Sequence, residues 1–371
     1  MTIQFDAQTP QSKSYLALVA VFGFATLIGA WLVWTSASPL WSWITAALGV
    51  LTMIAVGRVW REWRRNTSLV VSAKVVGRLA LFTVGVSALA VFGATAWIAH
   101  DRAYNLVHPS RSLPACPPGD FGLTDYRAVS FPTADGLLLR GWYVPAHNGA
   151  VIIMVHGHAG NRCELLPEAG FLVEAGYGVL LYDSRSSGES EGTLSTLGLL
   201  EVADVQGAVQ FVLTQTDGVG RIGLMGHSQG GGTVIRAGAR LPAVSAVIAE
   251  SAYTSLEDNI STGVQKLLGL PPFPFAPLVV FFGQREAGMD ITQVRPIDDI
   301  AALSPRPILL IHGAQDEVIP VSNAYSLYAV ASEPKELYVI PTAAHCCFLQ
   351  AGGEVYVERV LAFFNQALVQ P

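Results

Sequence analysis

Apolar residues dominate three stretches near the N-terminus, and the spacing of charged residues separates these stretches from the rest of the chain. No charged side chain occurs between Lys13 and Arg58, a span that contains two apolar runs, at about 15–34 and 39–57. A third charge-free run covers about 79–99. About 20 apolar residues in a helix cross the hydrocarbon core of a bilayer. We therefore expect three transmembrane helices here, in preference to three buried helices of a soluble protein.

Basic side chains predict how these helices are oriented. Six of the seven Lys and Arg residues within 1–100 lie between Arg58 and Arg78. Short loops rich in Lys and Arg stay on the cytoplasmic side of a membrane. The third helix then leaves the cytoplasm, so the remaining chain is expected on the extracytoplasmic side of a plasma (inner) membrane. If the first run is instead a cleaved signal peptide, for which it is long, the later part lies on the same side.

The pattern changes after residue 100. Residues 101–120 contain four prolines and predict a linker. From 121 to 371, short continuous apolar runs alternate with segments of helical length. Arg127–Pro132 and Leu137–Val144 flank an Asp-Gly turn and predict a β-hairpin. The apolar runs typical of buried strands are Val151–Val155, Val179–Tyr182, Ile222–Met225, Val244–Ala249, Ile308–Ile311 and Leu337–Ile340. The helical segments are Arg162–Ala175, Leu199–Thr214, Gly230–Arg240, Ser322–Ala331 and Glu354–Leu368. Continuous apolar strands alternating with helices predict an α/β domain with a mostly parallel, doubly wound sheet.

Composition agrees with a membrane segment followed by a globular domain. The chain is 51% hydrophobic and 13% charged, with a mean hydropathy of +0.43. Residues 1–100 carry a basic surplus, so the net charge of −6 arises from the later part. An acidic domain does not favour nucleic acid as a partner, because nucleic-acid-binding proteins present clustered basic residues. Four cysteines are too few for a disulfide scaffold.

A serine between two glycines is the first candidate for chemistry. Gly226-His227-Ser228-Gln229-Gly230 follows a predicted strand and opens a predicted helix. A serine in a tight strand-to-helix turn leaves little room for neighbouring side chains, which explains the glycines. The turn exposes the hydroxyl group. We therefore expect Ser228 to act as a nucleophile.

A serine nucleophile needs a base, and the base needs an acid that orients it. His345 follows the last predicted strand, and Asp316 follows the strand before it. The carboxyl ends of parallel strands converge at one crevice, so Ser228, Asp316 and His345 are expected to meet there as a catalytic triad. Two alternatives stay open. Asp316 could instead cap the following helix, and Glu250, at the end of another strand, is the rival orienting acid.

The negative charge that develops on the substrate oxygen requires two backbone N–H donors. The residue after the nucleophile supplies one, which points to Gln229. The loop after the first central strand supplies the other, and we expect it to be the amide of His158. The side chain of His158 is expected to face the pocket or solvent, and His156 to be a buried structural histidine.

These motifs together resemble the α/β-hydrolase superfamily, near serine hydrolases related to prolyl oligopeptidase and to membrane-anchored esterase-like proteins. The resemblance covers about 121–371 and includes three further stretches, Asp135–Leu137, His156–Arg162 and Tyr182–Gly192. It implies an α/β-hydrolase fold and the triad named above. It also implies that Asp183 and Arg185 belong to a structural loop. It does not indicate the substrate, and Cys346-Cys347 directly after His345 is a departure from it.

Two other features concern ligands. Residues 253–304 are longer than a plain connection and rich in apolar residues, which fits either a lid or acyl pocket or an ordinary packed helix and loop. Histidines and cysteines gather near His156 and near His345, but neither group has the paired spacing of a zinc site. The sequence therefore predicts no metal and no cofactor. A disulfide from Cys163 to Cys346 or Cys347 is a further hypothesis, because the fold brings these loops near one another.

The leading hypothesis is a membrane-anchored serine hydrolase that cleaves carboxylic esters of small-molecule or lipid-like substrates. Ser228 attacks, His345 transfers protons and Asp316 orients the histidine, while His158 and Gln229 hold the oxyanion. A serine peptidase and an acyltransferase use the same triad, so both remain alternatives. A non-catalytic binding domain tethered to the membrane is the alternative from a different class.

Overall fold

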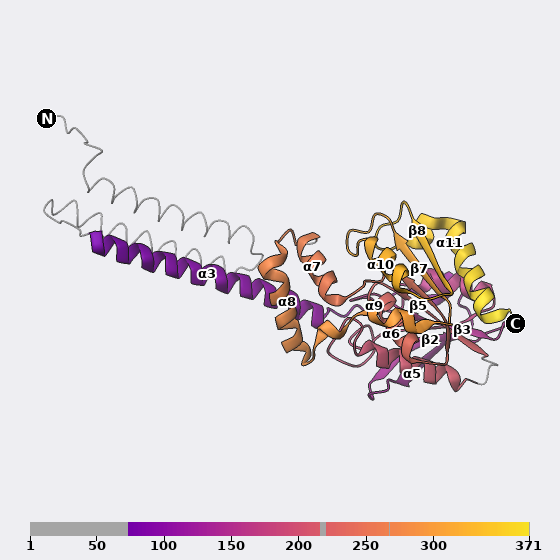
Figure 1. Ribbon diagram of the computed structural model, residues 1–371. Coiled ribbons are helices and arrows are strands. Elements are labelled where there is room, and N and C mark those ends of the chain that lie inside the picture. Colours follow the sequence, from indigo (N-terminus) through magenta and orange to yellow (C-terminus); the bar gives the residue numbers. More distant parts are fainter. Residues whose placement is uncertain (1–72, 216–219, 267, 371) are drawn as a thin grey trace. The chain divides into compact units, whose positions relative to one another are not determined.

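The computed structural model describes residues 73–215, 220–266 and 268–370. The chain divides after Ala99 into two compact units, Met1–Ala99 and His100–Pro371. The second unit contains an eight-stranded sheet in the order β1-β2-β4-β3-β5-β6-β7-β8 (Figure 1). Its strands are β1 Arg127–Pro132, β2 Leu138–Val144, β3 Ala150–Val155, β4 Gly178–Tyr182, β5 Arg221–His227, β6 Val244–Glu250, β7 Ile308–Gly313 and β8 Lys335–Ile340. Each strand coincides with a strand predicted from the sequence to within a few residues.

The sheet is antiparallel at one edge and parallel elsewhere. Strand β1 pairs with β2, and β2 with β4, in antiparallel registers, whereas every other pair from β4 to β8 is parallel. The carboxyl ends of β3, β5, β6, β7 and β8 therefore lie along one edge. Loops that follow these strands meet at that edge, which is the usual site of ligands in an open α/β sheet.

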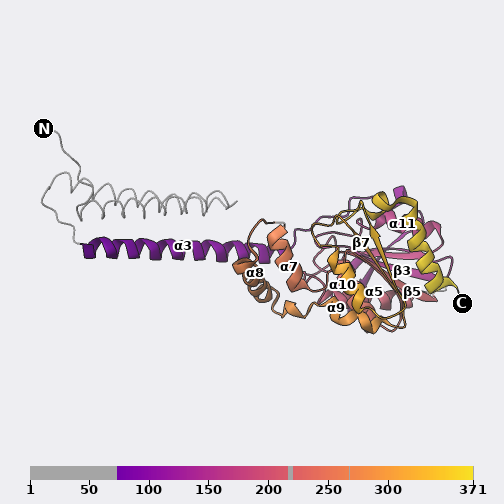
Figure 2. The ribbon, with the colours of Figure 1, turned by 45° about the horizontal axis from the view of Figure 1, so that its top comes forward.

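Helices cover both faces of the sheet, and this explains why the central strands are apolar along their whole length. In β3 every residue is buried. Val151, Ile153 and Val155 pack into one core, which includes side chains of α5 (Glu201–Leu213), α6 (Gln229–Arg240) and α10 (Ser322–Val330). Ile152 and Met154 pack into a second core with α4 (Leu166–Glu174) and α11 (Phe348–Phe364). Figures 1 and 2 show α11 and α5 on opposite sides of the sheet. The predicted doubly wound α/β class is confirmed.

The long insertion between β6 and β7 is largely helical. Its elements are α7 Leu256–Lys266, α8 Pro272–Ala287, η2 Ile291–Gln293, α9 Pro296–Asp299 and η3 Ile300–Leu303. Ile300 and Leu303 are buried in the core that includes side chains of α5, α6 and α10. In contrast, α8 presents Phe273 and Phe281 to solvent with 81% and 50% of their surface exposed. The insertion therefore combines packed segments with an exposed apolar helix.

The prediction of three transmembrane helices is wrong for the part of the chain that can be tested. Two predicted spans, 15–34 and 39–57, lie outside the described residues. The third, 79–99, falls within α3, Ala73–Val107. Among the described residues, no helix combines the length and apolar character that a membrane crossing requires. The helix extends beyond the apolar run and includes the polar residues His100–Arg102.

Residues 101–120, expected to form a linker, belong to the second compact unit. They contain the last turns of α3, an extended stretch and the start of η1, Pro118–Phe121. Within this unit, His100 Nε2 lies 3.1 Å from a carboxylate oxygen of Glu286 in α8. The end of α3 is therefore attached to the helical insertion by a polar contact.

Candidate active site

A single strained residue connects β5 to α6. The strand ends at His227 and the helix begins at Gln229, so Ser228 forms the turn with φ 57° and ψ −115°. Residues other than glycine rarely adopt such backbone angles, and the strained conformation persists only where the surrounding structure enforces it. A Cβ atom on Gly226 would collide with the carbonyl group of Gly230, and one on Gly230 with the backbone of β3. Both glycines are thus required because backbone packs directly against backbone.

The side chains of Ser228, His345 and Asp316 form a continuous hydrogen-bonded chain. Nε2 of His345 lies 2.9 Å from Oγ of Ser228. Nδ1 of the same ring lies 2.8 Å from Oδ2 of Asp316. A carboxylate can only accept, so Nδ1 carries the proton and Nε2 is left to accept the serine proton. The structure brings together the three residues that the sequence proposed as a triad.

Further donors fix the orientation of the Asp316 carboxylate. Its Oδ1 accepts hydrogen bonds from the amides of Val318 and Ile319, at 2.9 and 2.7 Å. Its Oδ2 accepts one from the hydroxyl of Ser251 at 2.8 Å, in addition to that from His345. A carboxylate held by four donors has little freedom to rotate, so it presents a fixed acceptor to the imidazole.

These contacts also keep Asp316 ionised. Burial alone would raise the pKa of Asp316, but hydrogen bonds from His312 and His345 outweigh burial and hold the pKa well below its usual range. Nε2 of His312 lies 3.4 Å from Oδ2. An anion at this place stabilises the positive charge that His345 acquires when it takes a proton.

Glu250, the rival acid, points elsewhere. Its Oε1 accepts a hydrogen bond from the phenol of Tyr356 in α11 at 2.7 Å. Burial raises the pKa of Glu250 to about 7, against the opposing charge of His227. Only the backbone of Glu250 reaches the nucleophile turn, where its carbonyl accepts the amide N–H of Ser228 at 2.8 Å. The carboxylate that faces His345 is therefore that of Asp316.

The two residues proposed for the oxyanion hole are neighbours. Nδ1 of His158 lies 3.1 Å from Oε1 of Gln229. His158 is on the loop after β3, and Gln229 is the first residue of α6, so both amides lie close to the turn. His156, on the same loop, is buried and bridges two loops, because its Nε2 accepts from the amide of Ser184 at 3.0 Å and its Nδ1 donates to the Gly157 carbonyl at 2.7 Å.

Comparisons with known proteins bear on the family and the fold of this chain. The model of the X-Pro dipeptidyl-peptidase (S15) family matches residues 94–273. The protein YfhR of Escherichia coli (strain K12) is 33% identical over 254 residues, which are 65% of this chain and 81% of YfhR. The α/β hydrolase domain-containing protein WAV2 of Arabidopsis thaliana is 28% identical over 259 residues, 65% of this chain and 79% of WAV2. An esterase of Pyrococcus furiosus superposes with a TM-score of 0.62 at 25% identity, over 71% of this chain and 98% of the esterase.

The chain belongs to the α/β-hydrolase superfamily. Strand order, the serine turn and these likenesses together make it a serine hydrolase. The α/β-hydrolase fold expected from the sequence resemblance is confirmed for the second unit.

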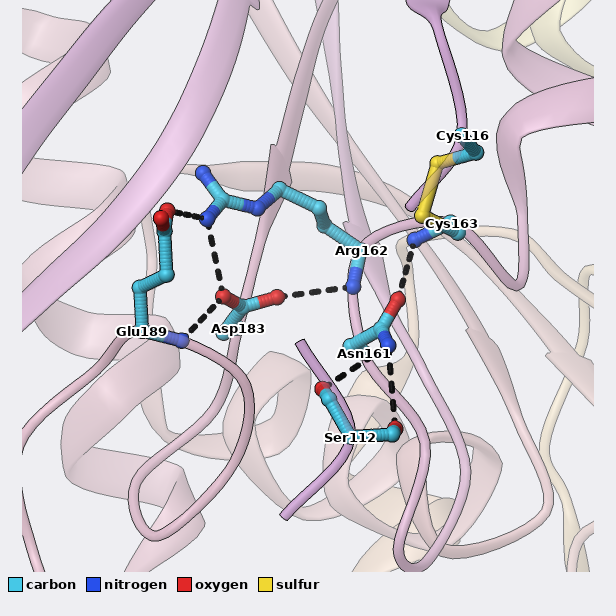
Figure 3. Close-up of a disulfide and its surroundings, with 7 residues drawn as sticks. All are labelled: Ser112, Cys116, Asn161, Arg162, Cys163, Asp183 and Glu189. Carbon is cyan, nitrogen blue, oxygen red and sulfur yellow. Dashed lines mark hydrogen bonds and ion pairs between the residues drawn. A yellow bond between two sulfur atoms is a disulfide. The ribbon is translucent and has the colours of Figure 1, made fainter. Parts of the chain in front are cut away.

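A polar network holds the loop after β3 that carries His158, called the oxyanion loop after the role expected of it (Figure 3). Asp183, after β4, accepts the amide of Arg162 at 2.9 Å with one oxygen. Its other oxygen contacts the Arg162 guanidinium at 3.0 Å and the amide of Glu189 at 2.9 Å. Glu189 also pairs with the Arg162 guanidinium. Asp183 thus joins the loop after β3 to the loop after β4 and does not contact the triad.

Arg185 has a similar structural setting. Its guanidinium is buried and contacts Asp204 in α5 at 2.7 Å and Asp135 in the β1–β2 turn at 2.9 Å. Burial opposes the charge of Arg185, but these two carboxylates raise its pKa above the usual value. The pairing links three separate segments, in agreement with the structural loop that the resemblance implied.

The disulfide hypothesis named the wrong partner. Cys163 is bonded to Cys116, with Cα atoms 5.9 Å apart (Figure 3). Cys346 and Cys347 are exposed free thiols. The stretch after α3 passes beside the oxyanion loop, where Nδ2 of Asn161 also donates to the Ser112 carbonyl at 3.1 Å. Cys116 lies far from Cys163 in the sequence, so only the folded path of this stretch reveals the pairing.

Two polar residues beside the triad were not singled out from the sequence. Glu164 and His227 form a close pair, with 2.6 Å between Oε1 and Nδ1. His227 adjoins Ser228 in the sequence, which is the one signal that could have drawn attention to it. Glu164 lies on the opposite side of the turn, on the loop after β3, and carries no motif of its own.

Proposed function

We propose that this serine hydrolase cleaves carboxylic esters through a covalent acyl-enzyme. Oγ of Ser228 bonds to the ester carbonyl carbon while its proton passes to Nε2 of His345. The same proton then passes to the alcohol oxygen as the carbon–oxygen bond breaks. Water repeats the sequence on the acyl-serine, which releases the carboxylic acid and restores the serine. Asp316 holds the ring and balances its positive charge.

The observation that carries this proposal is the unbroken chain of hydrogen bonds. Its two links measure 2.9 and 2.8 Å, which is the distance that proton transfer requires. The strained turn at Ser228 supports the same role, because it raises the hydroxyl out of the sheet. The amides of His158 and Gln229 are the proposed donors to the oxyanion, supported by the contact between the two side chains.

One observation favours an ester, and a second favours an apolar acyl group. The likeness to the Pyrococcus furiosus esterase extends over nearly all of that protein. The insertion carries exposed Phe273 and Phe281 on α8, and we propose that this helix acts as a lid that contacts the acyl chain. Burying an aromatic side chain against an acyl chain contributes about 1.5–3 kcal/mol, enough to select longer chains.

A peptidase is the second candidate, and one specific observation favours it. The match to the X-Pro dipeptidyl-peptidase family covers 94–273, which includes the serine turn and the first insertion helix. Ester and amide cleavage use the same triad and differ mainly in the leaving group. Substrate tests therefore decide between the two activities.

The experiment has two steps. A fluorophosphonate probe should label wild-type protein and leave Ser228→Ala unlabelled, with both proteins giving the same thermal unfolding profile. Rates are then measured on p-nitrophenyl esters from acetate to decanoate and on an X-Pro p-nitroanilide. Ester turnover that rises with chain length supports the proposal. Faster cleavage of the anilide favours the peptidase, and absence of labelling contradicts both.

We also propose that the hydrolase unit works in an oxidising compartment. The Cys116–Cys163 disulfide supports this location, because such bonds persist outside the reducing cytosol. Mass spectrometry of protein alkylated before lysis should find these two cysteines linked. Recovery of both as alkylated thiols would contradict the proposed location.

A further inference from the structure

A second histidine lies directly beneath the catalytic one. Nδ1 of His227 is 2.6 Å from Oε1 of Glu164, and Nε2 is 2.6 Å from the backbone carbonyl of His345. The rings of His227 and His345 have centroids 5.1 Å apart. A carbonyl oxygen only accepts hydrogen bonds, and so does an ionised carboxylate. Both ring nitrogens of His227 must therefore carry protons, which makes the ring an imidazolium.

The carboxylate of Glu164 also supports the oxyanion loop. Its Oε1 accepts the amide N–H of Gly157 at 3.0 Å. A Cβ atom added to Gly157 would lie 3.0 Å from the same oxygen, and one added to Gly160 would collide with Oε2. The carboxylate therefore fills the concave side of the loop that carries His158. The two glycines leave room for it.

The charges around His227 maintain its protonated form. Burial would lower the pKa of His227, but the hydrogen bond and charge of Glu164 raise it to about 9. Burial would in turn raise the pKa of Glu164, and His227 holds it below the usual value. Several titratable groups surround His227. Three are carboxylates, namely Glu164, Glu168 of α4 and Glu250 of β6. The others are His345, on the loop after β8, and Tyr356 of α11, which donates to Glu250.

We propose that Glu164 and protonated His227 are positioning residues of the active site. Their ion pair connects the backbone of His345 to the loop that carries the oxyanion donor. It thereby fixes the positions of the base and of the oxyanion donor relative to Ser228. The side chain of His227 is 8% exposed and that of Glu164 is 30% exposed, so the imidazole is largely shielded from water. This inference rests on the proposed function, because it concerns the reaction of Ser228 with an ester.

The test compares three carboxamide variants of the full chain with wild type. Glu164→Gln and His227→Gln each remove the charge pair, and we expect kcat for an ester to fall about 10- to 100-fold with KM changed less than about threefold, as for a small misplacement of reacting groups. Glu168→Gln is the matched control. It makes the same chemical change at a nearby carboxylate in α4 and should keep the wild-type kcat.

A pH profile separates positioning from a general loss of structure. As pH rises through about 9, His227 loses its proton and one of its two hydrogen bonds, so wild-type kcat should fall in an alkaline limb near that pH. The limb should persist in Glu168→Gln and disappear in His227→Gln. Nitrogen-15 NMR of histidine-labelled protein at pH 7 should show both ring nitrogens of His227 protonated.

The outcomes distinguish the two proposals. If wild type neither reacts with fluorophosphonate nor turns over esters, the proposed function fails. If wild type is active and all three variants match it, the positioning role alone is overturned. A neutral His227 in the NMR spectrum overturns it as well, whatever the activity. A loss of kcat with the alkaline limb retained in His227→Gln would reduce the pair to a purely structural contact.

Discussion

Two acids at the carboxyl ends of neighbouring strands have opposite surroundings. Asp316 follows β7 and accepts hydrogen bonds from backbone amides, a serine and His345, and its pKa is lowered. Glu250 ends β6, where its side chain is buried against Tyr356 and its pKa is raised to about 7. The carboxylate of Asp316 points toward the reacting groups, while that of Glu250 points into the core on the α11 side.

The difference shows that a place at the end of a strand does not make an acid catalytic. Ionisation requires donors that compensate for burial, and Asp316 has four whereas Glu250 has one phenol. A charged partner for an imidazole must remain ionised throughout the reaction. The two carboxylates therefore differ in orientation and in pKa because of their hydrogen-bond donors, although both lie at the ends of apolar strands in the same sheet.

Removing the nucleophile sets the baseline for comparing the two acids. We expect Ser228→Ala to lower kcat about 10⁶-fold. The triad residues act as a unit, so the loss of one essential residue removes nearly all of the rate enhancement. The double variant Ser228→Ala/Asp316→Asn should be no slower than the single one. Steady-state ester kinetics measure this, and circular dichroism checks the fold. An additional loss in the double variant would mean that Asp316 acts outside the triad.

The sharpest test of the comparison is Asp316→Asn. An amide cannot supply the negative charge, and it favours the wrong tautomer of His345, so kcat should fall by about 10⁴-fold. The amide keeps the size of the carboxylate, which limits changes in packing. Ester turnover measured at pH 7.5 gives the effect. A fall of less than tenfold in folded protein would leave a Ser228–His345 dyad.

The matched change at the other acid, Glu250→Gln, should alter kcat by less than about threefold. The amide oxygen can still accept the hydrogen bond from Tyr356, so the free energy of unfolding should change by roughly 1 kcal/mol. Parallel kinetics and urea unfolding test both expectations. Turnover lower than that of Asp316→Asn would reverse the assignment of the orienting acid.

The smallest effect concerns Glu168, which lies close to Glu250 in the buried region below the turn. Burial and the charge of Glu250 raise the pKa of Glu168 to about 8, above its unfolded value of 4.5. A raised pKa means that the folded protein binds the proton more tightly, so this contribution to stability is lost as pH rises from about 4.5 to about 8. Glu168→Gln should therefore flatten the decline in stability across this window by on the order of 1 kcal/mol. Urea unfolding at pH 5 and pH 8.5 measures the difference, and an unchanged slope would contradict it.

Local sequence was sufficient for much of the fold. Val151–Val155 is apolar on both faces, a pattern typical of a strand covered on two sides, so the central strands could be located. The glycines around Ser228 predicted the tight turn, because backbone contact at Gly226 and Gly230 excludes any side chain. These features depend on near neighbours in the chain, and for that reason the pattern of residues alone indicates them.

Contacts between distant segments required the tertiary structure. The choice of Asp316 over Glu250 depends on which side chain faces His345, and strand-end positions are equivalent in this respect. Cys116 meets Cys163 because the stretch after α3 runs beside the oxyanion loop. The apolar run at 79–99 resembled a membrane span, but no helix among the described residues has the length and apolar character of one. Sequence by itself determined the sheet, the nucleophile turn and the order of serine, acid and histidine. Only the folded chain decided the acid, the disulfide and the pairing of Glu164 with His227, because each depends on the direction of a side chain toward residues far away in the sequence.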